Sequence, residues 1–205
     1  MRRGAIILCG GKSSRMGRAK AALPFGPELM LQRVVRLIGE TVDSVNIVVV
    51  AAAGQSLPEL PVGVTVAHDS REYRGPLEGL ATGLSALADR VDAAYATGCD
   101  VPLLVPALVD FMFQSLGDHD VVVPRDGEYH HPLAAVYRPR VLAKIQELLA
   151  ADRLRPRFLF DEVDTWEILV DELRGVDPEL LTLRNLNSPE DYEAALATAG
   201  FGSSP

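Results

Sequence analysis

Short apolar runs alternate with stretches of helical periodicity along most of the chain. Runs such as IVVV and VVV are rich in β-branched residues and lack polar alternation, which is typical of strands covered on both faces of a parallel sheet. The pattern predicts six strands: Ala5–Cys9, Val45–Val50, Val64–Ala67, Ala94–Thr97, Val121–Pro124 and Leu133–Tyr137.

Helical patterns fill the intervals between these strands. The last helix has a clear start, because Ser188 can cap it, Pro189 suits its first position and Asp191 follows the cap by three residues. The predicted helices are Glu28–Gly39, Leu77–Ala88, Pro106–Leu116, Arg140–Ala150 and Pro189–Ala197. Alternating strands and helices imply right-handed crossovers and an α/β fold with a mostly parallel sheet. Ligands bind such sheets at the carboxyl ends of the strands, so the loops after the first and fourth strands become the candidate site.

The composition fits a folded protein that works in a reducing compartment. The chain has 205 residues, of which 48% are hydrophobic, and shows no repeat or linker. We therefore expect one domain over residues 1–199 and a flexible tail at 200–205. No apolar run approaches the roughly 18 residues of a membrane span, and Cys9 and Cys99 fit no zinc or CxxC pattern. We therefore expect a cytoplasmic protein without a membrane as partner. The excess of 28 acids over 20 bases argues against a nucleic acid as partner.

Positive charge is concentrated at the start of the chain. Residues 1–27 contain no acid but carry six basic residues: Arg2, Arg3, Lys12, Arg15, Arg18 and Lys20. Such a cluster in an acidic protein indicates a site for a compact anion such as a phosphate chain. A solvated basic face is the alternative.

The loop after the first predicted strand has the residues that a phosphate site needs. It has the sequence LCGGKSSRMGRAKAALPFG, residues 8–26. Gly10 and Gly11 let the backbone approach a ligand, and Arg15 and Lys20 add cations. The spacing matches neither a Walker A loop nor the Gly-x-Gly-x-x-Gly dinucleotide fingerprint. The loop therefore predicts a phosphate site of a different class.

This loop resembles the L-A-G-G-x-S-x-R-M-G-x-x-K signature of the molybdenum cofactor guanylyltransferases (molybdopterin-guanine dinucleotide biosynthesis protein A family). Four further segments resemble family motifs in the same order: GPLEGL at 75–80, GCDVP at 98–102, HPLAAVYRP at 131–139 and NLNSPEDY at 185–192. The resemblance covers nearly the whole chain. It implies a three-layer α/β/α Rossmann-like fold of the nucleotide-diphospho-sugar transferase type.

Asp100 follows a predicted strand of small and apolar residues and precedes Pro102. A carboxylate at a strand's carboxyl end, facing a phosphate loop, is well placed to hold Mg²⁺, which prefers oxygen ligands. A helix cap or an ordinary loop acid is the alternative. The resemblance gives Asp100 the same metal-binding role and makes it catalytic, together with Arg15 and Lys20.

The resemblance also implies the binding residues. Those for the nucleotide are Leu8, Cys9, Gly10, Gly11, Lys20, Asp69 and Asp100. Those for the second substrate are His131, Asn185 and Asn187. Asn187 could instead serve the turn before Ser188, and His131 could order the start of the next strand. We interpret Cys9 as a small buried residue rather than a nucleophile.

The implied reaction transfers GMP from GTP to the terminal phosphate of molybdenum-molybdopterin and releases pyrophosphate, with Mg²⁺ as cofactor. Other cofactor-biosynthesis or molybdoenzyme delivery proteins are further candidate partners. The alternatives are a cytidylyl or other nucleotidyltransferase of the same superfamily, or a nucleotide-binding protein without turnover. The sequence departs from the family at Ala19, where an Asp is common, and at Ala51, where an Asn can contact the nucleotide. Both departures concern contacts to the base.

Overall fold

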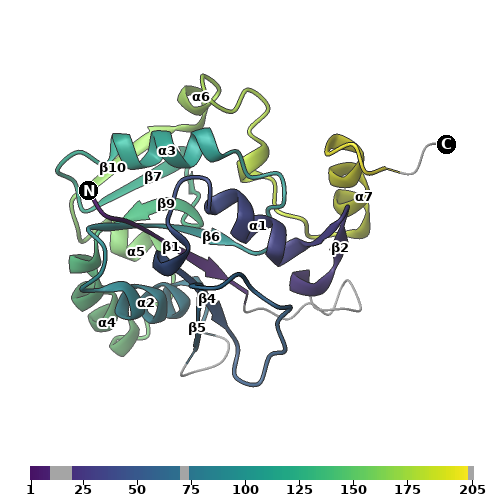
Figure 1. The fold of residues 1–205 in the computed structure, drawn as a ribbon. Coiled ribbons are helices and arrows are strands. Elements are labelled where there is room, and N and C mark those ends of the chain that lie inside the picture. Colours follow the sequence, from purple (N-terminus) through teal and green to yellow (C-terminus); the bar gives the residue numbers. More distant parts are fainter. Residues whose placement is uncertain (10–19, 70–73, 203–205) are drawn as a thin grey trace.

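The computed structural model describes residues 1–9, 20–69 and 74–202, which form a sheet between two layers of helices (Figure 1). The strands are β1 Arg3–Leu8, β2 Pro24–Phe25, β3 Glu28–Leu29, β4 Ile47–Ala51, β5 Thr65–His68, β6 Ala93–Gly98, β7 Val121–Asp126, β8 Tyr129–His130, β9 Ala134–Tyr137 and β10 Thr165–Leu169. The α-helices are α1 Met30–Ile38, α2 Pro76–Leu87, α3 Pro106–Ser115, α4 Leu142–Ala150, α5 Arg157–Phe160, α6 Val170–Leu173 and α7 Pro189–Thr198. Four 3-10 turns complete the elements: η1 Lys20–Ala22, η2 Ser44–Asn46, η3 Pro139–Val141 and η4 Leu181–Leu183.

The main sheet has the strand order β10-β7-β9-β6-β1-β4-β5, with β8 paired to β7. Neighbouring strands run parallel except at β9, which is antiparallel to both β6 and β7, and at β8. The prediction of a mostly parallel α/β sheet is therefore confirmed. From β1 the chain passes to β4 and β5 on one side and then returns through α2 to β6 on the other side of β1. The strand order therefore reverses at β1, and the ends of β1 and β6 lie at the crevice where such sheets bind ligands.

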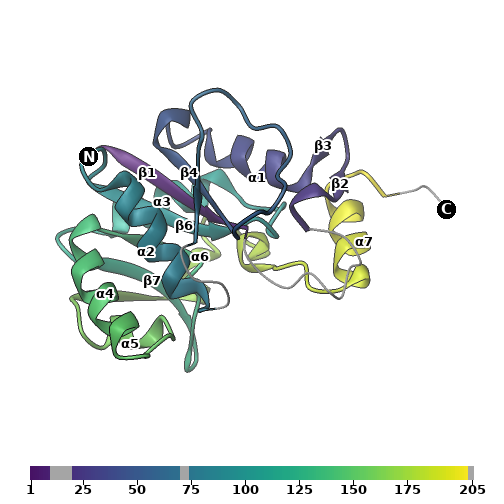
Figure 2. The same ribbon diagram turned by 90° about the horizontal axis from the view of Figure 1, so that it is seen from below.

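Alternation along the central strands separates two hydrophobic cores. Ile7 and Val49 face the core under α1, α3 and α6, whereas Ile6 and Val48 face the core under α2, α4 and α5. Figures 1 and 2 show these two helical layers on opposite faces of the sheet. The three-layer prediction is thus confirmed, and it explains why the central strands are mostly apolar.

Helix α2 approaches β1 closely because two of its residues are glycines. A Cβ at Gly83 would lie 2.4 Å from Cγ2 of Ile6, and one at Gly79 would lie 2.9 Å from Cδ2 of Leu8. Both distances are shorter than carbon atoms tolerate. The glycines therefore bring the N-terminal half of α2 down beside the end of β1.

A third, smaller hydrophobic cluster lies beyond the carboxyl end of the sheet. It joins the β2–β3 hairpin to α7 through Leu23, Phe25, Met30, Leu103, Leu186 and Ala195. Figure 1 shows α7 beside β2 and away from the two main layers. This cluster brings the segment before α7 back toward β1 and β6.

Several elements differ from the sequence predictions, and the short elements β2, β8, α5 and α6 were not predicted. Glu28 and Leu29 belong to β3, paired with β2, so the following helix begins at Met30 rather than at Glu28. Strand β10 was not predicted, and it pairs in parallel with β7 at one edge of the sheet. The start of α7 is as predicted, because the Ser188 hydroxyl accepts a hydrogen bond from the backbone N–H of Asp191. None of the helices in the described part of the chain combines the length and apolarity of a membrane span.

Candidate active site

The register of β1 and β6 determines which loops meet. Leu8 lies opposite Gly98 in this parallel pair, so Cys9 and Asp100 continue from neighbouring strand ends. Backbone hydrogen bonds continue the alignment of the chains beyond the strand ends. Cys99 N–H donates to Leu8 C=O at 3.0 Å, and Cys9 N–H donates to Val50 C=O at 2.8 Å. The loops after the first and fourth of the strands predicted from the sequence thus start side by side.

Asp100 is held in a bend that needs a glycine beside it. A Cβ at Gly98 would lie 2.5 Å from Oδ1 of Asp100, so any larger residue would displace the carboxylate. The backbone C=O of Asp100 accepts a hydrogen bond from Leu186 N–H at 2.9 Å. The Asp100 side chain is 19% exposed, so it can meet a ligand while its charge remains partly shielded from water.

Lys20 reaches Asp100 from the first position of η1. Its Nζ atom lies 2.8 Å from Oδ2 of Asp100 and 3.1 Å from Oδ1 of Asn187. The η1 turn, which begins at Lys20, fixes the backbone from which this side chain extends. The lysine therefore links a carboxylate and an amide from two distant segments.

The two asparagines of the segment before α7 complete the group. Asn185 donates from Nδ2 to Oδ1 of Asp100 at 3.0 Å, and Asn187 accepts from Lys20. We call Lys20, Asp100, Asn185 and Asn187 the Lys20–Asp100 cluster. Sequence analysis singled out all four residues, and the structure brings them together.

A buried carboxylate anchors the segment that carries the asparagines. Asp177 is 1% exposed, and its two oxygens accept hydrogen bonds from the backbone N–H groups of Leu181 and Thr182, each at 2.9 Å. The Thr182 hydroxyl in turn accepts a hydrogen bond from Val105 N–H at 3.0 Å. These bonds tie η4 to the start of α3, so the following residues reach Asp100 from a fixed point.

Asp69 follows β5 and is separated from the cluster by β4 and β1. Its backbone N–H donates to Ala51 C=O at 3.0 Å. Burial raises the pKa of its carboxyl, although a hydrogen bond with Thr82 opposes that shift. Within the described ranges its Oδ1 atom is buried and has no hydrogen-bond partner. This carboxylate could accept a hydrogen bond from a ligand.

Cys9 and Cys99 lie side by side under the cluster, although 90 positions separate them in the chain. Both are free and buried. A hydrogen bond with Cys99 and burial are the largest causes that raise the pKa of the Cys9 thiol. The interpretation of Cys9 as a small buried residue is confirmed by its burial, and a raised pKa disfavours the thiolate that a nucleophile needs.

His131 lies in the turn before β9, where its backbone N–H donates to Pro124 C=O at 2.9 Å. Its backbone C=O accepts a hydrogen bond from Ala134 N–H, so it orders the turn into the strand. Burial lowers the pKa of its imidazole. Among the described residues, no hydrogen bond joins its side chain to the cluster.

Three of the predicted site residues, Gly10, Gly11 and Arg15, lie outside the described residues. Besides Asp177, sequence analysis missed two further residues that support the site. Gln55 donates to Cys9 C=O at 3.1 Å, which joins the loops after β1 and β4. Arg33 donates to Pro102 C=O at 2.7 Å and lies over the ring of Phe25, which secures the turn after Asp100. Neither residue stands in a recognisable motif.

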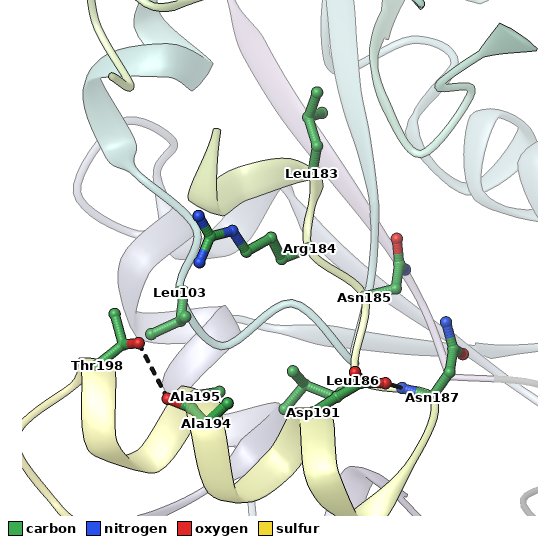
Figure 3. A pocket seen from close by; sticks show the side chains of 10 residues that line it. All are labelled: Leu103, Leu183, Arg184, Asn185, Leu186, Asn187, Asp191, Ala194, Ala195 and Thr198. Atoms are coloured by element: carbon green, nitrogen blue, oxygen red, sulfur yellow. Dashed lines mark hydrogen bonds between the residues drawn. The ribbon is translucent and has the colours of Figure 1, made fainter. Parts of the chain in front are cut away.

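A pocket of about 490 Å³ opens beside the segment that carries the asparagines. Its wall includes Arg184, Asn185 and Asn187 from this segment, Leu103 from the loop after β6, and residues of α7 (Figure 3). Its volume is in the range of small-molecule sites. The Lys20–Asp100 cluster therefore has room on this flank for part of a ligand.

The site can bind a triphosphate and a divalent cation, because a lysine, a carboxylate and amide groups meet at the carboxyl ends of parallel strands. Fold and site together define a nucleotidyltransferase. Residues 5–165 match the family described as "MobA-like NTP transferase domain", and the chain belongs to this family.

Individual relatives agree with this assignment. The chain is 35% identical to a Methanosarcina acetivorans protein named "Probable molybdenum cofactor guanylyltransferase", over 96% of this chain and 91% of that one. Among solved structures it is similar to molybdopterin-guanine dinucleotide biosynthesis protein A from Archaeoglobus fulgidus, with a TM-score of 0.74 and 17% identity over 96% and 98% of the two chains. It is also similar to Rv0371C of Mycobacterium tuberculosis, solved in complex with manganese, with a TM-score of 0.63 and 13% identity over 97% and 100%. Both structures support the fold.

Proposed function

We propose that this protein transfers GMP from GTP to the terminal phosphate of molybdenum-molybdopterin, with release of pyrophosphate. The observation that carries the proposal is the Lys20–Asp100 cluster at the carboxyl ends of β1 and β6, in a chain of the MobA-like NTP transferase family. The name of the Methanosarcina relative supports GTP and the molybdenum cofactor as its substrates.

The chemistry requires charge control rather than a strong base. The attacking group is a phosphate monoester, which is already anionic near neutral pH, so no proton has to be removed from it. The barrier lies in bringing two anions together and in stabilising the charge that grows on the leaving pyrophosphate. Lys20 neutralises part of this charge, and Arg15 adds a second cation from the loop after β1.

Asp100 is the residue that would hold Mg²⁺. Its carboxylate and the side-chain oxygen of Asn187 are hard oxygen ligands, and both accept hydrogen bonds from Lys20 Nζ. In the described part of the chain no three His, Cys, Asp or Glu side chains gather as a metal site. Mg²⁺ is typically bound by one or two carboxylates together with substrate phosphates, and Asp100 would supply the carboxylate. When bound, the ion supplies Lewis-acid polarisation of the phosphate oxygens.

The two substrates would lie on different sides of the cluster. Leu8, Cys9, Gly10 and Gly11 line the base and ribose of GTP. Asp69, whose Oδ1 atom has no hydrogen-bond partner among the described residues, accepts a hydrogen bond from the nucleoside. Asn185 and Asn187 orient the acceptor phosphate, while His131 contacts the pterin end of the acceptor. These assignments follow the motifs that each residue occupies.

Pyrophosphate release tests the proposal. The protein is incubated with each of the four ribonucleoside triphosphates, with and without molybdopterin and with and without Mg²⁺. We expect release with GTP, and only when acceptor and Mg²⁺ are both present. A protein that binds GTP but releases no pyrophosphate under any of these conditions would contradict the proposal.

A further inference from the structure

The carboxylate of Asp191 makes one bond more than the capping of α7 requires. Its Oδ2 atom accepts hydrogen bonds from the backbone N–H groups of Ser188 and Asn187, each at 2.9 Å. In a capping box, the side chain of the third helical residue returns only to the N–H of the cap residue, which here is Ser188. The bond to Asn187 holds a residue that lies outside the helix.

That second bond bears directly on the Lys20–Asp100 cluster. The side chain of Asn187 accepts from Lys20 Nζ, and the same Nζ contacts Asp100. Asn187 is exposed, so packing does not fix the position of the backbone from which its side chain extends. Figure 3 shows Asp191 bonded to the backbone of Asn187 at the edge of the pocket. The hydrogen bond that Asp191 accepts from Asn187 N–H is therefore a direct restraint on the backbone of this asparagine.

Charge acts in the same direction. The Asn187 N–H is the foremost cause that lowers the pKa of the Asp191 carboxyl, and the positive charge of Lys20 lowers it further. Asp191 is consequently ionised throughout the physiological range. The negative charge of Asp191 attracts Lys20 through space, toward Asn187.

We propose that Asp191 is a positioning residue of the active site, which holds Asn187 in the place where it meets Lys20. The inference rests on the proposed function of the Lys20–Asp100 cluster. The proposal gives Asp191 a second role beside the capping of α7.

Four variants separate positioning from capping. Asp191→Ala removes both bonds, and Asp191→Glu keeps a carboxylate of the kind that capping boxes use at this position. Ser188→Ala weakens the cap by removing the hydroxyl that accepts from Asp191 N–H, but leaves the Asn187 bond intact. Glu190→Gln removes a neighbouring negative charge from the same helical turn.

Steady-state pyrophosphate release and amide hydrogen exchange are measured for all four variants. We expect Asp191→Ala to lower kcat about tenfold with the KM for GTP changed less than about twofold, since a small misplacement of a catalytic group costs rate. Exchange at the Asn187 amide should accelerate in this variant alone. Asp191→Glu should recover most of the rate, and the two controls should stay within about twofold of wild type.

The proposal is overturned if Asp191→Ala and Ser188→Ala lose the same activity, or if the Asn187 amide exchanges alike in both. A wild-type protein that releases no pyrophosphate would instead overturn the proposed function. In that case the amide exchange of Asn187 alone decides whether Asp191 holds it.

Discussion

The Nζ atom of Lys20 lies 2.8 Å from Oδ2 of Asp100, across 80 positions of the sequence. Each side chain is only 19% exposed, so the pair is shielded more than an ordinary surface ion pair. One partner suits the phosphates of a nucleotide and the other suits a divalent cation. The pairing keeps the two charges at one point, where the nucleotide and its metal would meet.

Replacement of Asp100 should abolish turnover and leave the fold intact. In Asp100→Ala the carboxylate proposed for Mg²⁺ is lost, whereas the cores on both faces of the sheet are untouched. The measurement is pyrophosphate release together with thermal unfolding. A matched control is Asp110→Ala, which removes a carboxylate on α3 that pairs with Arg3. Activity of Asp100→Ala equal to that of the control would remove Asp100 from the mechanism.

Lys20→Ala should lower kcat by about 10²–10³-fold, because charge on the triphosphate grows toward the leaving group in the transition state. Lys144→Ala, which removes a surface lysine paired with Glu147 on α4, is the control and should keep the wild-type rate. Steady-state kinetics with varied GTP separate the two parameters. A change in KM alone would mean that Lys20 binds substrate and transition state equally.

Asp69→Asn should affect binding and stability in opposite directions. Burial raises the pKa of this carboxyl, so its ionised form is disfavoured in the folded protein, and a neutral amide removes that cost at pH 7. We expect an unchanged or higher melting temperature, together with a KM for GTP raised about tenfold by the loss of a charged acceptor. An unchanged KM would exclude Asp69 from the nucleotide site.

His131 should make the protein less stable as the pH falls. Burial lowers its pKa below the value of 6.5 that it has when exposed, so the unfolded state binds the proton first. Its contribution is therefore fully present above about pH 7 and is lost as the pH falls through 6.5 toward the lower folded pKa. Urea midpoints at pH 7.5 and 5.5 measure the effect. His131→Asn should show a smaller difference between the two midpoints, and an equal difference would refute this role.

The sequence predicted the buried core of the fold better than its edges. Strands such as β4 and β7 can be recognised in the sequence by their β-branched runs, which are unbroken because both faces of these strands are covered. Strand β10 was missed because Ile168 is its only buried residue, so no apolar run marks it. Glu28 was assigned to a helix because its pairing with Phe25 depends on a hairpin that periodicity does not reveal.

The same distinction applies to the site. Family motifs identified Lys20, Asp100, Asn185 and Asn187 individually, but their mutual hydrogen bonds arise from strand register and from the cluster that docks α7. Cys9 and Cys99 fit no sequence pattern that would pair them, yet parallel pairing of β1 with β6 puts them in contact. Gln55 acts through a single bond to a backbone carbonyl, and a contact of that kind leaves no pattern in the sequence.

Nucleotide competition tests the central claim most directly. The protein is given equal concentrations of GTP and CTP with Mg²⁺ and molybdopterin, and the dinucleotide product is identified by mass spectrometry. Although Ala51 cannot supply a side-chain hydrogen bond to the base, one such bond is worth only about 0.5–1.5 kcal/mol, or roughly tenfold at most. We therefore predict a product that contains predominantly GMP. A product that contains predominantly CMP would contradict the guanylyl assignment.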